Sequence, residues 1–406
     1  MKVAWFSPFS PQRSGISHYS ERIARALRGR CEVHLWADCE VDEGLKGEFR
    51  VFNYAADPAL LSGLDGYDAV VYNMGNNALY HGNIYDAMAA RPGVVVLHDY
   101  YLSGFFMNHY GKSADVRRLL SECGARGFLQ YASAALRYRF THHVLRRPFA
   151  AVEKTNFWFD REVCARARGV VVHSFFARDK LLQGGCRRPV EKINHPYFSD
   201  GEAAASGPSA DPARAAGGKF VILSIGEATP YKQLDKVILA LARDRSLREN
   251  SVFYVIGQPF EERIDLGAMV KRHGLGDAVV FLGYQPMEVV YQHLSRADAY
   301  IGLRYPTMGE TSGGLIRAME QGKACLVTDI GWYSELPDDC VVKIGAPVDV
   351  GELARALSRL AGDAGYRAAV GSNARRHVHE EFSMDLYVER LLAFAGRVCG
   401  GGSTPA

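Results

Sequence analysis

The stretch Ile301–Gly322, IGLRYPTMGETSGGLIRAMEQG, runs from an apolar strand through a Gly/Ser/Thr loop into a helix. Small and apolar residues of this helix recur at i, i+3, i+4 and i+7 and so share one face: Leu315, Ala318, Met319 and Gly322. At the start of such a helix the backbone N–H groups lack partners within the helix, and the positive end of the helix dipole lies beside them. The stretch therefore predicts a strand–loop–helix unit that binds a phosphate or another anion at its loop.

A carboxylate lies in the same loop. Glu310 precedes Thr311, Ser312 and Gly313, which are the residues that would offer free N–H groups to an anion. Because a carboxylate repels an anion, its presence favours a ligand that also carries uncharged hydroxyl groups. A nucleotide sugar has this layout, since a polyol is joined to a diphosphate.

Length and composition indicate an ordinary globular protein. A chain of 406 residues with 48% hydrophobic and 23% charged residues is long enough for two domains. A formal net charge of +3 gives no support for nucleic-acid binding, so no nucleic-acid partner is expected. The eight cysteines form no C-x-x-C pair, and no apolar run reaches the ~18 residues of a membrane span. We therefore expect a cytoplasmic protein with reduced thiols.

Strand-like and helix-like patterns alternate along the chain. Strands are predicted at Val3–Ser7, Glu32–Trp36, Ala69–Tyr72, Val94–His98, Gly169–His173, Phe220–Ile225, Val252–Ile256, Val279–Leu282, Ala299–Leu303, Ala324–Thr328 and Val341–Ile344. Helices are predicted at Ser17–Leu27, Leu234–Arg243, Pro286–Arg296, Gly314–Gln321, Val350–Gly362, Tyr366–Glu381 and Met384–Val398. This alternation is typical of α/β folds, so we expect two Rossmann-like, doubly wound parallel-sheet domains that face each other across a cleft.

A change of composition separates the two domains. Residues 199–218 contain no Val, Ile, Leu or aromatic residue and cannot build a core, so they are predicted to be a linker or surface loop. The first domain is then expected at residues 1–198 and the second at residues 219–383. A tail at residues 399–406 is predicted to be disordered beyond the last helix.

Ligands of such domains bind at the carboxyl ends of the strands. Lys232 follows a strand and the turn at Gly226, where its ammonium can reach a phosphate, although a solvated lysine fits this position as well. His98 ends a buried strand and can hydrogen-bond a sugar hydroxyl or exchange a proton, the alternative being a satisfied core histidine. Gly15 begins the first helix at another N-terminus suited to an anion.

Residues 101–160 are basic and rich in aromatic side chains, with nine Lys and Arg against four acids. This stretch fits contact with an anionic membrane surface or a phosphate-bearing acceptor, and a solvated helical insertion fits it as well. The sequence contains no G-x-G-x-x-G, P-loop, Asp-x-Asp or H-x-x-x-H pattern. Neither an NAD site nor a metal site is therefore expected.

Together, and in this order, these motifs resemble a retaining glycosyltransferase of family 4, in the group 1 glycosyl transferases with the GT-B fold. The resemblance covers nearly the whole chain and rests on Ser14-Gly15-Ile16, His98-Asp99, Val170–Ser174, Gly226 to Lys232, Phe281–Tyr284 and Gly309–Gly322. It implies a nucleotide-sugar donor on the second domain and a glycan or lipid-linked glycan acceptor on the first. It also implies no cofactor or metal, and a last helix at 384–398 that returns to the first domain.

By position, the resemblance implies catalytic roles for three residues. Lys232 would contact the diphosphate, Glu310 would hold sugar hydroxyls, and His98 would face the reacting sugar. The implied donor-binding residues are Gly15, Gly226, Lys232, Tyr284, Arg304, Glu310, Thr311, Ser312 and Gly313. Transfer is then expected without a protein nucleophile, because the leaving phosphate can take the proton of the acceptor hydroxyl.

The chain departs from the family pattern at two places. Glu227 stands where the family has an arginine, so Arg304 or Arg263 would have to help neutralise the diphosphate. Arg317 stands where the family has a second glutamate that contacts ribose, and Gly309 occupies the place of the first glutamate. Two alternatives therefore stay open: a nucleotide-sugar epimerase on the same fold, with His98 as its acid or base, and a non-catalytic carbohydrate-binding relative.

Overall fold

The computed structural model describes residues 1–12, 14–109, 160–198, 218–258 and 265–400, with a few isolated residues between 125 and 136. Most of the predicted basic stretch at 101–160, almost all of the predicted linker, Arg263 and residues 401–406 of the predicted tail lie outside the described residues.

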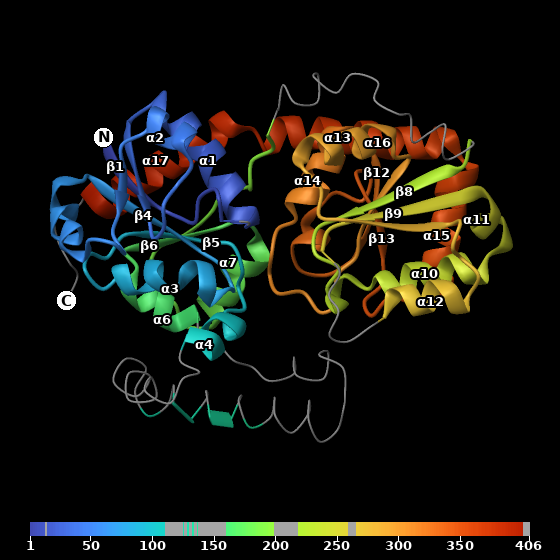
Figure 1. Cartoon of the computed structure of the whole chain (residues 1–406), viewed down its shortest axis with the longest axis horizontal. Helices are drawn as coiled ribbons and strands as arrows, with labels where there is room; N and C mark the ends of the chain where they lie inside the picture. The colour runs from blue at the N-terminus through green and yellow to red at the C-terminus, as the bar shows by residue number, and fades with distance from the viewer. Residues whose placement is uncertain are drawn as a thin grey trace.

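Two parallel sheets lie side by side, each with helices on both faces (Figure 1). The first sheet has seven strands in the order β3-β2-β1-β4-β5-β6-β7 and the second has six in the order β10-β9-β8-β11-β12-β13. The strands of the first sheet are β1 (Lys2–Phe6), β2 (Glu32–Ala37), β3 (Val51–Asn53), β4 (Ala69–Met74), β5 (Val94–Leu97), β6 (Gly169–Val172) and β7 (Val190–Lys192). Those of the second are β8 (Phe220–Ile225), β9 (Ser251–Ile256), β10 (Val279–Gly283), β11 (Ala299–Gly302), β12 (Ala324–Thr328) and β13 (Val342–Ile344).

The helices follow the strands in the alternation that the sequence predicts. The first domain contains α1 (Gly15–Arg28), α2 (Glu43–Glu48), η1 (Pro58–Gly66), α3 (Ala78–Ala87), α4 (Ser103–His109), α6 (Asp160–Arg166) and α7 (Phe175–Gln183). The second contains η4 (Pro230–Lys232), α10 (Leu234–Arg243), α11 (Arg245–Asn250), α12 (Leu266–Arg272), α13 (Met287–Arg296), α14 (Gly313–Glu320), η5 (Gly331–Glu335), α15 (Val350–Gly362) and α16 (Ala364–Glu381). The chain ends its described part with α17 (Met384–Gly400).

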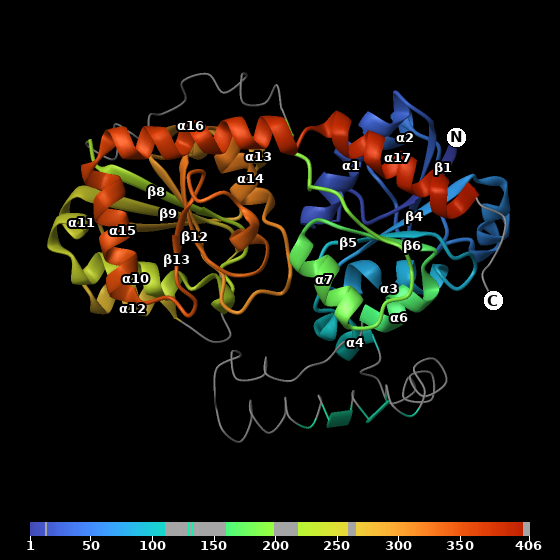
Figure 2. The ribbon, with the colours of Figure 1, turned by 180° about the vertical axis from the view of Figure 1, so that it is seen from behind.

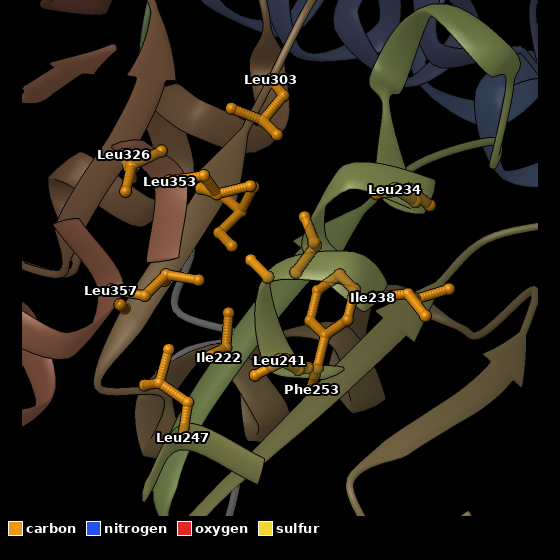
Figure 3. Packing of buried hydrophobic residues seen from close by; sticks show 14 of the residues in the cluster. Ile222, Leu234, Ile238, Leu241, Leu247, Phe253, Leu303, Leu326, Leu353 and Leu357 are labelled. Atoms are coloured by element: carbon orange, nitrogen blue, oxygen red, sulfur yellow. The ribbon is translucent and has the colours of Figure 1, made fainter. Parts of the chain in front are cut away.

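Each sheet is buried on both faces, which explains why its strands read as continuous apolar runs. In the second domain, Leu241 of α10 and Leu357 of α15 pack with Ile222 and Phe253 of the sheet in one hydrophobic cluster (Figure 3). A second cluster, on the opposite face, contains Leu315 of α14 together with residues of α13 and α16. The predicted two-domain α/β fold is confirmed.

The last helix packs on the first domain. After α16 covers the second sheet, α17 continues along α1 and the strands β4, β5 and β6 (Figure 2). Phe394 of α17 lies close to Gly169 of β6. A Cβ atom on Gly169 would be 2.7 Å from Cζ of Phe394. The helix extends to Gly400, two residues beyond the predicted end at Val398, so the predicted tail begins inside the helix.

The strands β3 and β7 are absent from the sequence prediction. Each has only three residues and lies at an edge of the first sheet, and in each strand all three residues are only partly buried. A strand this short shows neither clear alternation nor an apolar run, so its pattern cannot be distinguished from a loop.

Candidate functional site

The loops after β5 and β11 meet where the two domains face each other. The backbone N–H groups of Tyr100 and Tyr101, just after β5, both donate to the carbonyl of Met308 at 3.1 Å. Gly309 has a φ of 76°, and a Cβ atom there would collide with Cβ of Tyr100. Glycine is therefore required for both the backbone shape and the close approach.

A second contact joins the domains. The carboxylate of Glu335, at the end of η5 in the second domain, accepts hydrogen bonds from Phe175 N–H at 2.9 Å and from Phe176 N–H at 2.6 Å. These N–H groups belong to the first turn of α7 in the first domain, where they have no partner within the helix. Burial raises the pKa of Glu335, and the two N–H donors oppose this shift. One domain thus caps a helix of the other.

Both carboxylate oxygens of Glu310 are engaged within its own loop. Oε1 accepts from Arg304 Nε at 2.6 Å, and Oε2 accepts from Thr307 Oγ1 at 3.1 Å and from Met308 N–H at 2.7 Å. Arg304 is 9% exposed and also donates to the carbonyl of Leu303. The ion pair therefore shapes the loop, while Oε1 of Glu310, which accepts one bond, keeps a lone pair that can accept from a sugar hydroxyl.

Lys232 is buried, with 6% of its surface exposed, and its ammonium donates to the carbonyl of Ile225 at 2.7 Å. Burial, followed by repulsion from Arg304, holds the pKa of Lys232 well below its usual value. Gly226 has a φ of 101°, and a Cβ atom there would lie 2.6 Å from Nζ. An ammonium has three donors, so this lysine retains capacity for an anion.

The first turn of α14 leaves backbone donors free. Ser312 caps the helix, with its Oγ accepting from Leu315 N–H at 3.2 Å. The N–H groups of Gly313 and Gly314 have no acceptor in the described part of the chain. A Cβ atom at Gly314 would lie 2.6 Å from the hydroxyl of Tyr300, so glycine lets α14 pack closely on β11.

His98 lies at the end of β5 and has a defined tautomer. Its Nε2 is 3.2 Å from Oδ1 of Asn73, and Nδ2 of Asn73 donates to the carbonyl of Phe6 at 3.0 Å. The second bond fixes the orientation of the amide, so Oδ1 faces His98 and Nε2 must carry the hydrogen. Nδ1 of His98 is then a bare acceptor. It has no hydrogen-bond partner in the described part of the chain, and His98 is only partly buried.

Three further aromatic side chains surround His98. The ring of Tyr19 lies 4.7 Å from it in an edge-on arrangement, and the rings of His173 and Tyr19 are 5.9 Å apart. His195 stacks obliquely on Tyr19 at 4.9 Å. Burial lowers the pKa of His173 to about 4 and that of His195 to about 3, and it holds the pKa of His98 well below 6.5. All three imidazoles are therefore neutral at neutral pH and can accept hydrogen bonds.

Asp99 follows His98 and lies beside the second domain. Its Oδ2 accepts from Asn76 N–H at 2.9 Å. Burial raises the pKa of Asp99 to about 6, with a smaller contribution from the negative charge of Glu310. Asp99 of the first domain therefore lies close enough to Glu310 of the second for their charges to interact.

The structure brings most predicted site residues to one region. Lys232, Arg304 and Glu310 interact electrostatically with one another, and the loop of Glu310 contacts the segment after His98. Gly226 directly follows β8, Thr311 and Ser312 end the loop before α14, and Gly15 and Gly313 are the first residues of α1 and α14. Tyr284 is different, because it is 57% exposed and follows β10, an edge strand separated from β8 by β9.

Sequence reasoning missed four residues of this region. Asn73 lies inside the apolar strand AVVYNM, and its only signal is one polar residue in a buried run. Asp99 belongs to the His98-Asp99 motif but has no role in the sequence prediction, although it is a second polar residue at the same strand end. His195 and Glu335 lie far away in sequence and carry no local signal.

The described part of the chain contains neither a cluster of metal ligands nor a helix suited to span a membrane. Within it, no group of three or more His, Cys, Asp or Glu side chains is arranged to hold a metal ion. No helix there is long and apolar enough to cross a membrane.

Residues 209–377 match the family described as Glycosyl transferases group 1. No curated protein matches the chain. Among solved structures, Anabaena HepE in complex with UDP is 15% identical, with 98% of this chain and 100% of that chain covered and a TM-score of 0.66. The fold is the GT-B fold. A sucrose-phosphate synthase from Thermosynechococcus elongatus is also 15% identical over 98% and 99% of the two chains, with a TM-score of 0.66.

WaaG, a glycosyltransferase involved in lipopolysaccharide biosynthesis, is 18% identical, with 98% of this chain and 100% of that chain covered and a TM-score of 0.61. At these identities the likeness shows the GT-B fold alone. The family match covers most of the second domain, which is the domain that contains Lys232, Arg304 and Glu310.

Proposed function

We propose that the protein is a retaining glycosyltransferase of family 4 that transfers a hexosyl group from a nucleotide sugar to a hydroxyl of a glycan or lipid-linked glycan. One observation carries the proposal: the loop of Glu310 contacts the segment after His98, through Met308, and holds Arg304 close to Lys232. Cationic and backbone donors for a diphosphate thus lie opposite neutral imidazoles suited to hydroxyl groups. The family match of the second domain supports a transferase.

The second domain would bind the donor. Lys232 and the free N–H groups of Gly313 and Gly314 provide donors for the phosphates, and the dipole of α14 favours negative charge at the same place. Oε1 of Glu310 retains a lone pair for a sugar hydroxyl. The complex of Anabaena HepE with UDP-glucose makes uridine nucleotides the first donors to test.

The reaction would proceed on one face of the sugar. The acceptor oxygen bonds to the anomeric carbon as the bond from that carbon to the diphosphate oxygen breaks, and the acceptor proton moves to that leaving oxygen. Atoms and charges balance without a protein nucleophile. Lys232 stabilises the charge that develops on the diphosphate, while the neutral His98 accepts a hydrogen bond from a sugar hydroxyl at Nδ1 and orients the reacting ring.

The basic stretch at 101–160 leads us to propose a lipid-linked acceptor and contact with an anionic membrane surface. Sedimentation with vesicles in which about one lipid in five is anionic should deplete the protein from the supernatant. Vesicles of neutral lipid alone should not. Equal depletion by both would contradict this part of the proposal.

Substitution of Lys232 tests the transferase. We expect Lys232→Ala to lower kcat by ~10²–10³-fold, because a charge-stabilising donor of the leaving group is lost. Lys236→Ala, which removes a lysine four residues later on α10, is the matched control and should be near wild type. Product formation from UDP-glucose and a panel of glycan acceptors is the measurement.

The two alternatives are distinguished by two further measurements. If the protein is incubated with donor and no acceptor and an epimerised nucleotide sugar forms, the protein is an epimerase and not a transferase. Calorimetry that detects no binding of any nucleotide or nucleotide sugar would instead favour a non-catalytic carbohydrate-binding relative. Near wild-type turnover in Lys232→Ala would contradict the proposed donor site.

A further inference from the structure

Arg317 lies on α14 with its guanidinium at the boundary between the two domains. Its Nη2 is 3.3 Å from Nδ1 of His18 on α1, and the guanidinium lies 5.7 Å from the ring centre of Phe198. A Cβ atom at Gly313 would be 3.1 Å from Nη1. The side chain therefore folds back along its helix toward the first turn, as long side chains on helices do.

The charge of Arg317 has no acidic partner. No carboxylate in the described part of the chain lies within 4.0 Å of its guanidinium, and its Nε is buried with no hydrogen-bond acceptor. A guanidinium has five N–H donors, and among the described residues its hydrogen-bond partner is one neutral ring. Arg317 is partly buried, and a partly buried cation without a counter-charge loses some hydration that no carboxylate replaces, so the arrangement favours an anionic ligand.

The groups that face Arg317 do not neutralise it. Burial, together with the positive charges of Arg317, Arg22 and Arg25, lowers the pKa of His18 to about 3. The pKa of His195, whose ring also lies near Gly313, is likewise about 3 because of burial, with a contribution from Arg317. Both imidazoles are uncharged at neutral pH, so the region keeps its net positive charge.

Backbone donors lie beside this charge. The free N–H groups of Gly313 and Gly314 are in the first turn of α14, next to Nη1 of Arg317. The first turn of α1, which contains His18 four residues after its N-cap, approaches from the other domain. The N-terminus of α14 and an unpaired guanidinium therefore lie side by side, and each favours negative charge.

We infer that Arg317 binds a phosphate of the donor's diphosphate, an inference that rests on the proposed function of the site. It would supply the cation that is missing where Glu227 stands in place of the family's arginine. The charge is opposite to that of the family's second glutamate, and an unpaired guanidinium bonds a charged phosphate oxygen more strongly than a neutral ribose hydroxyl. The planar guanidinium can hold two phosphate oxygens at once.

Calorimetric titration with UDP, uridine and inorganic pyrophosphate tests the inference. We expect Arg317→Gln to weaken binding of UDP and pyrophosphate by about 10–100-fold and to leave uridine binding unchanged, since charged hydrogen bonds contribute about 1.5–3 kcal/mol. Arg317→Lys should lie in between. Arg355→Gln removes an exposed arginine on α15 and controls for the change in net charge; it should bind like the wild type.

The outcomes separate the inference from the proposed function. Equal weakening of uridine and UDP would assign Arg317 to the ribose, and unchanged binding of all three probes would make it an interdomain packing residue; either result overturns the inference. Failure of the wild type to bind UDP and pyrophosphate overturns it as well. Arg317-dependent binding of pyrophosphate by a protein that transfers no sugar would keep the anion site and reject the transferase.

The melting temperature of the free protein adds an independent readout. If Arg317 is an unpaired cation held for a ligand, the ligand-free Arg317→Gln variant should melt at the wild-type temperature or above it, because an uncompensated charge is removed. Pyrophosphate should then stabilise the wild type and not the variant. A lower melting temperature of the free variant, with unchanged stabilisation by pyrophosphate, would contradict the inference.

Discussion

At the scale of single residues, Asn73 decides which nitrogen of His98 is available to a substrate. The amide of Asn73 is fully buried and is held by the carbonyl of Phe6, so it can only accept from His98 Nε2–H. The acceptor nitrogen Nδ1 is thereby left for a hydroxyl. A histidine at a strand end could be predicted from the sequence, but its tautomer depends on a residue of a neighbouring strand.

We expect Asn73→Asp to introduce an acidic limb into the pH profile of kcat. In the wild type the pKa of His98 is far below 6.5, so His98 is neutral throughout the neutral range and kcat should not depend on its titration. A carboxylate in place of the Asn73 amide raises that pKa, and protonation at low pH then blocks Nδ1 as an acceptor. Activity should be lost as the pH falls through the raised pKa.

Asn250→Asp, an exposed change at the end of α11, is the control for that profile and should leave it unchanged. The Asn73→Asp variant also loses a donor to the carbonyl of Phe6, which is expected to cost about 1–3 kcal/mol of stability. Thermal melting at each pH separates this cost from the kinetic effect. A pH profile of Asn73→Asp that shows no acidic limb would contradict the assigned tautomer.

At the scale of elements, the loop between β11 and α14 is organised by its own ion pair. Arg304 and Glu310 are both mostly buried, with side-chain exposures of 11% and 15%, and the loop also uses Thr307 and Met308 to satisfy the carboxylate. The sequence predicts a loop rich in glycine followed by a helix. It does not reveal that Glu310 pairs with Arg304, because an irregular backbone over the six positions from one to the other can bring them together or hold them apart.

We expect Glu310→Gln to lower the free energy of unfolding by about 3 kcal/mol, because it leaves the Arg304 guanidinium buried without a counter-charge. The double variant Arg304→Met with Glu310→Gln should recover most of that loss, since it removes the unpaired charge. Transfer activity should stay low in both variants, because the sugar-binding carboxylate is absent.

Urea unfolding and steady-state kinetics measure these two effects separately. Stability that is not recovered in the double variant would show that Glu310 acts mainly through Thr307 and Met308. Activity that returns with stability would contradict a direct contact between Glu310 and the sugar.

At the scale of the whole molecule, two contacts hold the domains in the arrangement that builds the site. Tyr100 and Tyr101 bind the carbonyl of Met308, and Glu335 caps α7. The helices α16 and α17 span both domains on the side shown in Figure 2. The contacts that fix the domains thus involve residues separated by 160 positions, as for Phe175 and Glu335.

Glu335→Ala should loosen the domain arrangement. The first turn of α7 loses its acceptor, so we expect a larger radius of gyration by small-angle scattering and a KM for the donor that rises ~3–10-fold, in line with a contact of about 1 kcal/mol. Glu249→Ala, an exposed change on α11, is the control. Unchanged scattering together with an unchanged KM would show that the Glu335 contact does not position the domains.

The sequence by itself determined the alternating α/β pattern, the two domains and the glycine-rich start of α14, because local apolar periodicity and backbone requirements are readable one segment at a time. It also placed His98 at a strand end, and Lys232 and Glu310 in the segments that join a strand to the following helix. Only the tertiary structure decided what these groups face: Asn73 against His98, Arg304 against Glu310, and Arg317 against a neutral His18. Hydrogen-bond partners and burial depend on segments far apart in the chain, and no local pattern records them.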